Sequence, residues 1–225
     1  MADQAYLSVL CKDFPEERMM ERFAAFLATV PFSATRPGFT YLTIRAVDPS
    51  ESPAMEQDLR STPLDAGGII ALASEQLHSD SSYEVTCFWD LATFDPASGK
   101  SKVEPRALQL ICRGEDYDGG IWQDRGHLEA ELGVEHLFTG HAGLLGDRGD
   151  GRVIVAQSPE EARFLEVMAW PEIRDSYQQK TRENIRKLLD WTRLIERAVP
   201  VDRAWLWSEG EENFEARLEE IVAAR

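Results

Sequence analysis

Long apolar runs and cysteines are both scarce in this chain of 225 residues. No stretch approaches the ~20 apolar residues that a membrane-spanning helix needs, so we expect no membrane segment. The three cysteines, Cys11, Cys87 and Cys112, each lie in a short apolar run typical of a strand. An odd number of such thiols argues against a disulfide scaffold and is typical of a reducing compartment. The first 12 residues lack the basic and apolar segments of a secretory signal, so we expect a cytoplasmic protein.

Basic side chains are also few. Lysine and arginine together number 24 against 40 aspartates and glutamates, which gives a formal net charge of −16. Nucleic-acid binding requires a basic surface that displaces counterions from phosphates, so we expect no nucleic-acid partner. The same charge opposes binding to an anionic membrane surface and favours a basic protein as partner. Acidity also keeps many proteins soluble without any such role.

Several motifs that carry common chemistries are absent. No Gly-x-Ser-x-Gly nucleophile elbow occurs. The glycines of residues 140–146 are not followed by the Lys-Ser/Thr pair of a phosphate-binding loop. The acidic turn at residues 115–120 fails as an EF-hand calcium loop, because the required acidic positions hold Gly120 and His127. We therefore expect no cofactor.

The pattern that is present predicts an α+β fold with a mainly antiparallel sheet. Alternating apolar residues predict a three-strand meander, preceded by two strands that each lead into a helix. This order resembles a split α/β plait, in which helices cover one face of the sheet. Residues 48–63, with three prolines, are predicted to form a loop. The predicted strands cover residues 5–11, 39–47, 85–91, 108–112 and 128–132, and the predicted helices cover residues 14–30 and 64–77.

The hairpin between the first two meander strands has a predicted register. Folding the chain about Gly99 and Lys100 places Trp89 opposite Leu110 and Cys87 opposite Cys112. This register gathers the large apolar residues of both strands on one face, and a slip by one residue would expose the whole set. We therefore expect Cys87 and Cys112 to be neighbours across the two strands.

The character of the chain changes at Ser158. Residues 1–157 are predicted to form the sheet domain, and residues 158–225 a helical extension packed on it. Ser158, followed by Pro159 and Glu161, is a strong helix start, and Pro171 is expected to divide the first helical stretch into two. A short apolar run at 201–207 then precedes a last helix that has glutamates on its outer side.

Three of the four histidines fall close together, at His127, His136 and His141. His127 and Glu129 lie two apart on a predicted strand and so share a face, as two metal ligands or a base and its orienting acid would. A catalytic group of His127, Glu129 and His136, or a metal site of His127, Glu129 and His141, is one interpretation. The spacing matches no helix-borne zinc pair and lacks the Pro-Cys-x-x-Cys of a deaminase. Solvated or capping histidines are the competing interpretation.

The leading hypothesis is a non-catalytic interaction module that binds a basic protein, comparable by charge alone with inhibitors or immunity proteins of toxic basic enzymes. Asp116, Asp118 and the C-terminal glutamates would attract the partner. Trp205 or Trp207 would anchor it, because tryptophan is enriched at binding hot spots. The alternative is a small metal-dependent enzyme or ligand-binding domain that uses His127, Glu129 and His136. A homo-oligomer whose docking surface is its own copy is a third possibility.

Overall fold

In the part of the chain that the structure describes, seven strands form one antiparallel sheet. The computed structural model describes residues 3–141 and 158–223. The strand order is β3-β2-β4-β5-β6-β1-β7, so β4, β5 and β6 are consecutive neighbours. The α+β class, the mainly antiparallel sheet and the three-strand meander are thereby confirmed. The strands are β1 (Gln4–Cys11), β2 (Tyr41–Ala46), β3 (Met55–Asp58), β4 (Ser81–Asp95), β5 (Lys100–Arg113), β6 (Leu128–Val134) and β7 (Val201–Ser208).

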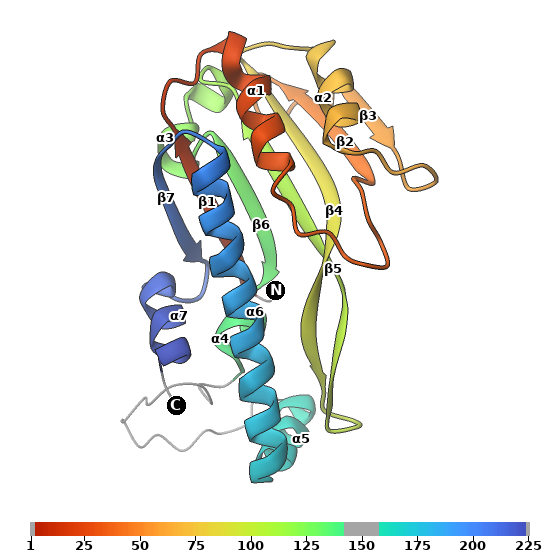
Figure 1. Ribbon diagram of the computed structural model, residues 1–225, viewed down its shortest axis with the longest axis vertical. Coiled ribbons are helices and arrows are strands. Elements are labelled where there is room, and N and C mark those ends of the chain that lie inside the picture. Colours follow the sequence, from red (N-terminus) through yellow and green to blue (C-terminus); the bar gives the residue numbers. More distant parts are fainter. Residues whose placement is uncertain (1–2, 142–157, 224–225) are drawn as a thin grey trace.

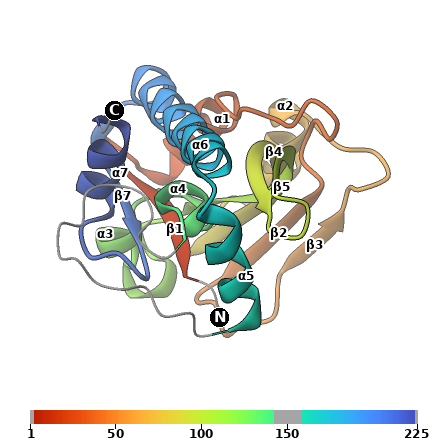
Figure 2. The same ribbon diagram turned by 90° about the horizontal axis from the view of Figure 1, so that it is seen from below.

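Most helices cover one face of this sheet (Figures 1 and 2). On that face lie α1 (Glu16–Leu27), α2 (Ala66–Ser74), α4 (His136–Thr139), α6 (Pro171–Ala198) and α7 (Phe214–Ala223). The short η1 (Tyr117–Gly119) and α3 (Trp122–Arg125) lie against the opposite face, where Arg125 of α3 reaches Tyr6 and Trp207. None of the helices in the described part of the chain has the length and apolar character to cross a membrane.

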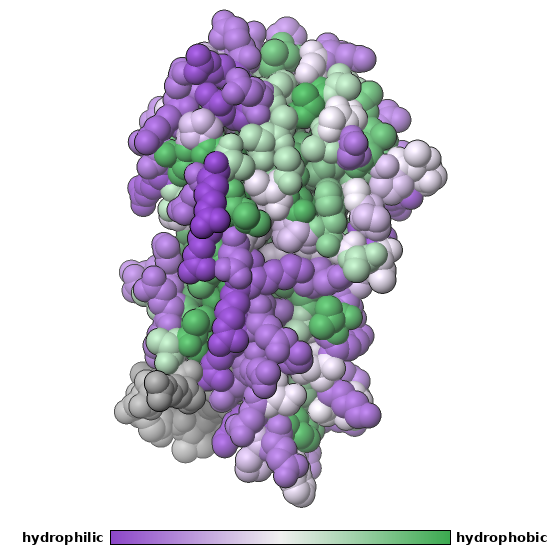
Figure 3. Space-filling model, in the orientation of Figure 1, coloured by the Kyte–Doolittle hydropathy of each residue, from purple (hydrophilic) through white to green (hydrophobic). Residues whose placement is uncertain are grey.

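The core lies between the sheet and α6. Trp89 of β4 and Trp191 of α6 are both almost fully buried, with ring centroids 5.8 Å apart. The indole of Trp191 donates a hydrogen bond to Thr29 Oγ1 at 2.9 Å, so its polar atom is paired inside the core. The outward side of α6 is covered by polar side chains (Figure 3). This amphipathic division is what the helical spacing of its apolar residues requires.

The predicted hairpin register is wrong by four residues. Cys87 lies opposite Leu108, and Cys112 lies opposite Tyr83, so the two cysteines are not cross-strand neighbours. The cause is the turn, which spans residues 96–99 instead of centring on Gly99 and Lys100. Asp95 fixes this turn because its carboxylate accepts hydrogen bonds from Ala97 N at 2.9 Å and Ser98 Oγ at 2.7 Å. A shift by an even number keeps the predicted face buried.

The far half of this hairpin extends beyond the sheet as a two-stranded arm. The pairing of β4 with β2 ends at Thr86, and the pairing of β5 with β6 begins at Gln109. The arm runs beside the first half of α6 and the helix α5 (Pro159–Met168) (Figure 1). A second, smaller apolar cluster joins these elements at the tip. Its buried members are Phe164, Met168 and Tyr177, with Phe94, Leu165 and Ile173 packed against them.

Both predicted helix starts in the C-terminal part agree with the structure. The Ser158 side chain accepts a hydrogen bond from Glu161 N and begins α5, and α6 begins at Pro171. The predicted loop at residues 48–63 instead contains the edge strand β3. Residues 201–208, predicted as part of a helical extension, form β7, which pairs with β1 in the main sheet. The C-terminal segment therefore completes the sheet as well as covering it.

Candidate functional site

The edge strand β7 presents its two tryptophans on the face opposite the core. Leu206 is buried in the core, whereas Trp205 and Trp207 are half-buried on the other side. Trp207 stacks on Tyr6 of β1, with ring centroids 4.1 Å apart and planes 10° apart. Its indole nitrogen donates to Ser8 Oγ at 2.9 Å. Trp207 is therefore held in one position, while the guanidinium of Arg203 lies 4.9 Å from the ring centre of Trp205.

Carboxylates gather where β7 ends. Glu209 accepts hydrogen bonds from Tyr6 Oη at 3.0 Å and Gln4 N at 3.1 Å. Glu135 accepts from Ser208 Oγ at 2.8 Å and from the amide of Gly210 at 3.2 Å. Burial and the bond to Glu209 raise the pKa of the Tyr6 hydroxyl, which therefore remains a donor.

Gly210 allows the chain to pass between the carboxylates of Asp3 and Glu135. A Cβ at this position would lie 2.5 Å from Asp3 Oδ2 and 2.7 Å from Glu135 Oε2, so any larger residue would displace a carboxylate. The exposed first turn of α7 continues the acidic surface. We call this surface the acidic edge; it consists of Asp3, Glu135, Glu209, Glu211, Glu212 and Glu215.

The predicted acidic loop lies apart from the strand that carries the tryptophans. The Asp116 carboxylate accepts a hydrogen bond from Ser79 Oγ at 2.6 Å, just before β4. The amide of Asp118 donates to the carbonyl of Val47, just after β2, at 2.7 Å. Both residues thus contact the β2–β4 connection. The structure connects Trp207 to Glu209 through Tyr6, but it places Asp116 and Asp118 against other elements.

His127 is buried between two aromatic rings. Its ring stacks on Phe14 at 4.2 Å and on Trp122 at 4.4 Å. Nδ1 accepts a hydrogen bond from Cys11 N at 3.1 Å, and Nε2 lies 3.7 Å from the Glu115 carboxylate. Burial lowers the pKa of this imidazole to about 4, so it is neutral at pH 7. The ring lines a shallow hollow of about 370 Å³ and packs there as an aromatic.

Glu129 makes contacts different from those of His127. Its carboxylate accepts a hydrogen bond from Arg113 Nη2 at 2.8 Å and is only 2% exposed. The Ser8 hydroxyl lies 3.5 Å from the other carboxylate oxygen, and Ser8 in turn accepts from Trp207. This chain of polar groups links the ion pair of Glu129 and Arg113 to the stacked rings of Trp207 and Tyr6. Across residues 3–141 and 158–223, no three His, Cys, Asp or Glu side chains are grouped to hold a metal ion.

His136 and His141 lie together in a different part of the molecule. Their rings stack with centroids 3.8 Å apart, at one wall of a cleft between the hairpin arm and α6. Burial, His141 and Arg106 lower the pKa of His136 to about 4. The structure therefore brings His136 and His141 together and places His127 in another hollow.

Sequence reasoning missed the charged residues of this cleft. Lys102, Glu104 and Arg106 alternate along β5 on the face that continues Leu108 and Leu110. The available signal was the run of charged side chains that continues the buried face of Leu108 and Leu110 along the same strand. Comparison with known protein families, curated proteins and solved structures gives no match to this chain.

Proposed function

We propose that the protein is a non-catalytic interaction module that binds a basic protein through the acidic edge. One observation carries the proposal: the carboxylates of Glu209 and Glu135 gather at the end of a strand whose Trp207 is already held in place. Fixed aromatic side chains lose little conformational entropy on binding, which suits them to be anchors. Surrounding carboxylates steer a basic partner toward them.

The two tryptophans have different roles in this proposal. Trp207 stacks on Tyr6 and contacts the guanidinium of Arg125, 4.4 Å from its ring centre, so it supports the surface. Trp205 is the contact residue, because a cationic side chain of the partner can take the position that Arg203 now occupies. The partner therefore needs an exposed Arg or Lys beside a basic surface.

The test compares two variants of equal charge. Glu212→Lys with Glu215→Lys reverses charge at the acidic edge, whereas Glu17→Lys with Glu56→Lys does so on α1 and β3, at exposed positions elsewhere. Tagged proteins are used to capture partners from native lysate at low salt, and proteins released by a salt step are identified by mass spectrometry. The association rate of each variant with the purified partner is then measured.

We expect the acidic-edge variant to associate at least about tenfold more slowly and with a weaker salt dependence. The α1 and β3 variant should retain most of the rate. Equal loss in both variants would contradict the assigned surface, and a failure to recover any basic partner would contradict the function. A sizing column shows whether the partner is a second copy of the chain.

The alternative of an enzyme or ligand-binding domain is supported at one of its residues only. His136 lies in a cleft, whereas His127 and Glu129 are buried in separate contacts. No described geometry points to a reaction.

A further inference from the structure

The cleft beside the hairpin arm is independent of the acidic edge. It has a volume of about 350 Å³ and is lined by β4, β5, α4 and α6. It lies between the main core and the small apolar cluster at the tip of the arm. We call it the hairpin cleft. Its lining includes the polar side chains of Lys102, Glu104, Arg106, His136, His141 and Lys180.

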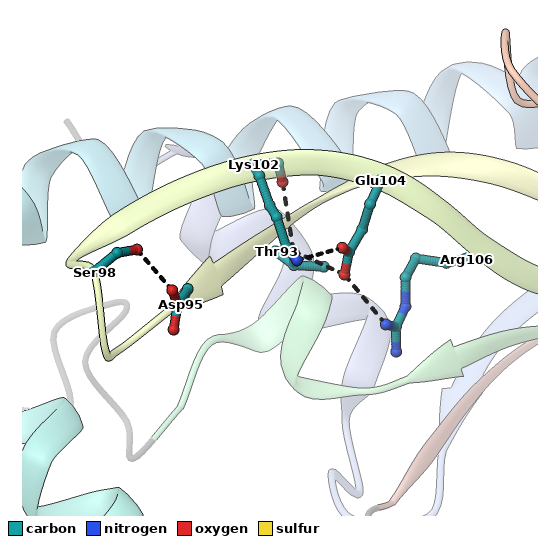
Figure 4. A network of polar contacts seen from close by, with 6 residues as sticks. All are labelled: Thr93, Asp95, Ser98, Lys102, Glu104 and Arg106. Carbon is teal, nitrogen blue, oxygen red and sulfur yellow. Dashed lines mark hydrogen bonds and ion pairs between the residues drawn. The ribbon is translucent and has the colours of Figure 1, made fainter.

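Glu104 lies between two cations of the cleft (Figure 4). The Glu104 carboxylate lies 2.7 Å from Lys102 Nζ and 3.4 Å from Arg106 Nη1, and it accepts a hydrogen bond from Thr93 Oγ1 at 3.1 Å. One carboxylate is thus shared by two cations, and the bond to Lys102 is the largest reason that its pKa is lowered. Asp95 is directed into the turn, where it bonds Ser98.

The opposite wall adds another cation. Lys180 of α6 lines the cleft while its ammonium pairs with Glu183 at 2.6 Å. The lining therefore holds three cations, Lys102, Arg106 and Lys180, and Glu104, the turn-bound Asp95 and Glu183 balance their charge. The whole chain, in contrast, has a net charge of −16. Arg106 makes the longest of these ion pairs, at 3.4 Å.

Burial is the main cause of the lowered pKa values of the two histidines. Burial is the main reason that the pKa of His136 is lowered, and the charge of Arg106 lowers it further. Burial also lowers the pKa of His141, against the opposing charge of Glu161 on α5. Both imidazoles are neutral at pH 7 and supply hydrogen-bonding nitrogens to the cleft.

The walls are fixed before any ligand arrives. The Asn184 side chain on α6 is buried and accepts a hydrogen bond from Ala92 N at 2.8 Å. Its amide donates to the carbonyls of Ala92 and Leu137, each at 2.9 Å, which joins α6 to β4 and α4. Tyr177 Oη accepts from the amide of His141 at 2.9 Å. A cleft with such walls loses little entropy on binding.

Apolar side chains line part of the same cleft. Phe94 and Tyr177 lie edge to face, with ring centroids 5.4 Å apart, and Leu137 adds an aliphatic surface. Clefts that combine an apolar wall with a few convergent polar groups are typical small-molecule sites. The wall favours a ligand with a planar or apolar body as well as its charged group.

We propose that the hairpin cleft binds a small ligand that carries a carboxylate or phosphate group beside Arg106 and Lys102. A guanidinium can form two parallel hydrogen bonds with either oxyanion. The neutral imidazole of His136 becomes a better proton acceptor once an anion offsets the charge of Arg106. Binding therefore raises the pKa of His136.

The experiment titrates the full chain with benzoate, inorganic phosphate and sodium chloride at constant ionic strength. Affinity is measured by calorimetry, and the pKa of His136 is followed by NMR with and without each anion. We compare wild type with Arg106→Gln, Lys102→Gln and the matched control Arg193→Gln, an exposed position on the outside of α6. Thermal unfolding shows that each variant is folded.

We expect saturable binding of benzoate or phosphate, a rise in the pKa of His136, and an affinity at least about tenfold weaker in Arg106→Gln. Lys102→Gln gives the same direction if Arg106→Gln fails to fold, and Arg193→Gln should bind as wild type does. Benzoate binding without phosphate binding indicates a carboxylate ligand with an apolar body, and the reverse result a phosphate ligand. Equal weakening in Arg193→Gln, or chloride binding as tightly as the oxyanions, overturns the proposal.

Discussion

The acidic edge and the hairpin cleft differ in their balance of charge and also in how their charges are held. At the acidic edge, exposed carboxylates face water and are screened by salt. In the hairpin cleft, cations and carboxylates instead pair with one another, and Glu104 contacts both Lys102 and Arg106. The net charge of −16 describes the first region and misdescribes the second. Net charge is thus a guide to long-range attraction and not to the ligand of a particular site.

Lowering the pH should have the largest effect on stability, because buried neutral histidines then become protonated on unfolding. The pKa of His136 in the cleft and of His127 beneath α3 is lowered from 6.5 to about 4 in the folded chain. The unfolded chain then binds more protons between these values, so stability is full above pH 6.5 and is lost as pH falls toward 4. We expect each histidine to contribute about 1–3 kcal/mol to this loss.

Denaturant unfolding at pH 7 and pH 4.5 measures this effect. His136→Asn should reduce the loss between the two pH values, and the same change at exposed His78 is the matched control. A pH dependence that is unchanged in His136→Asn would show that burial of this imidazole is not what the structure indicates.

A smaller effect distinguishes the single shared carboxylate of the cleft from the many acids of the edge. Glu104→Gln removes the charge that lies between Lys102 and Arg106, so both cations become available to a bound anion. We expect benzoate or phosphate affinity to rise by about three- to tenfold, equivalent to about 0.7–1.4 kcal/mol. Glu212→Gln at the acidic edge should leave the affinity for benzoate and phosphate unchanged. Weaker anion binding in Glu104→Gln would contradict the charge assignment.

The smallest effect concerns Glu131, which lies between the two regions on the sheet face opposite the core. Burial, together with Glu129, Glu84 and Glu209, raises the pKa of Glu131. Its charged form is therefore disfavoured in the folded chain, and the stability linked to its protonation is lost as pH rises through the folded pKa. We expect Glu131→Gln to stabilise the protein at pH 8 by up to about 1 kcal/mol, measured by denaturant unfolding. A loss of stability would mean that the carboxylate is needed.

Local patterns in the sequence were sufficient for the fold class, the meander and the start of α5. Ser158 with Pro159 predicts a helix start in almost any context, because capping depends on neighbouring backbone groups alone. The register of the hairpin depended on which residues form the turn. The carboxylate of Asp95 decided this through two bonds that no periodicity reveals.

The sites were harder to predict because they combine distant segments. Trp207 was identified from composition, but its support by Tyr6 joins residues about 200 positions apart. The short polar strand β3, with sequence MEQD, carries no apolar alternation and so could not be distinguished from a loop. The hairpin cleft draws Arg106, His136 and Lys180 from three elements, which only the folded chain brings together.

The even register shift of the hairpin has a consequence for how this arm can change during evolution. Adding two residues to each strand would lengthen the arm by about 7 Å and keep every side chain on its present face. Adding one residue to β5 between Arg106 and Leu108 would turn Lys102, Glu104 and Arg106 away from the cleft. Sequence divergence can therefore resize the arm in paired steps, while an unpaired insertion at this point would remove the charged lining of the cleft.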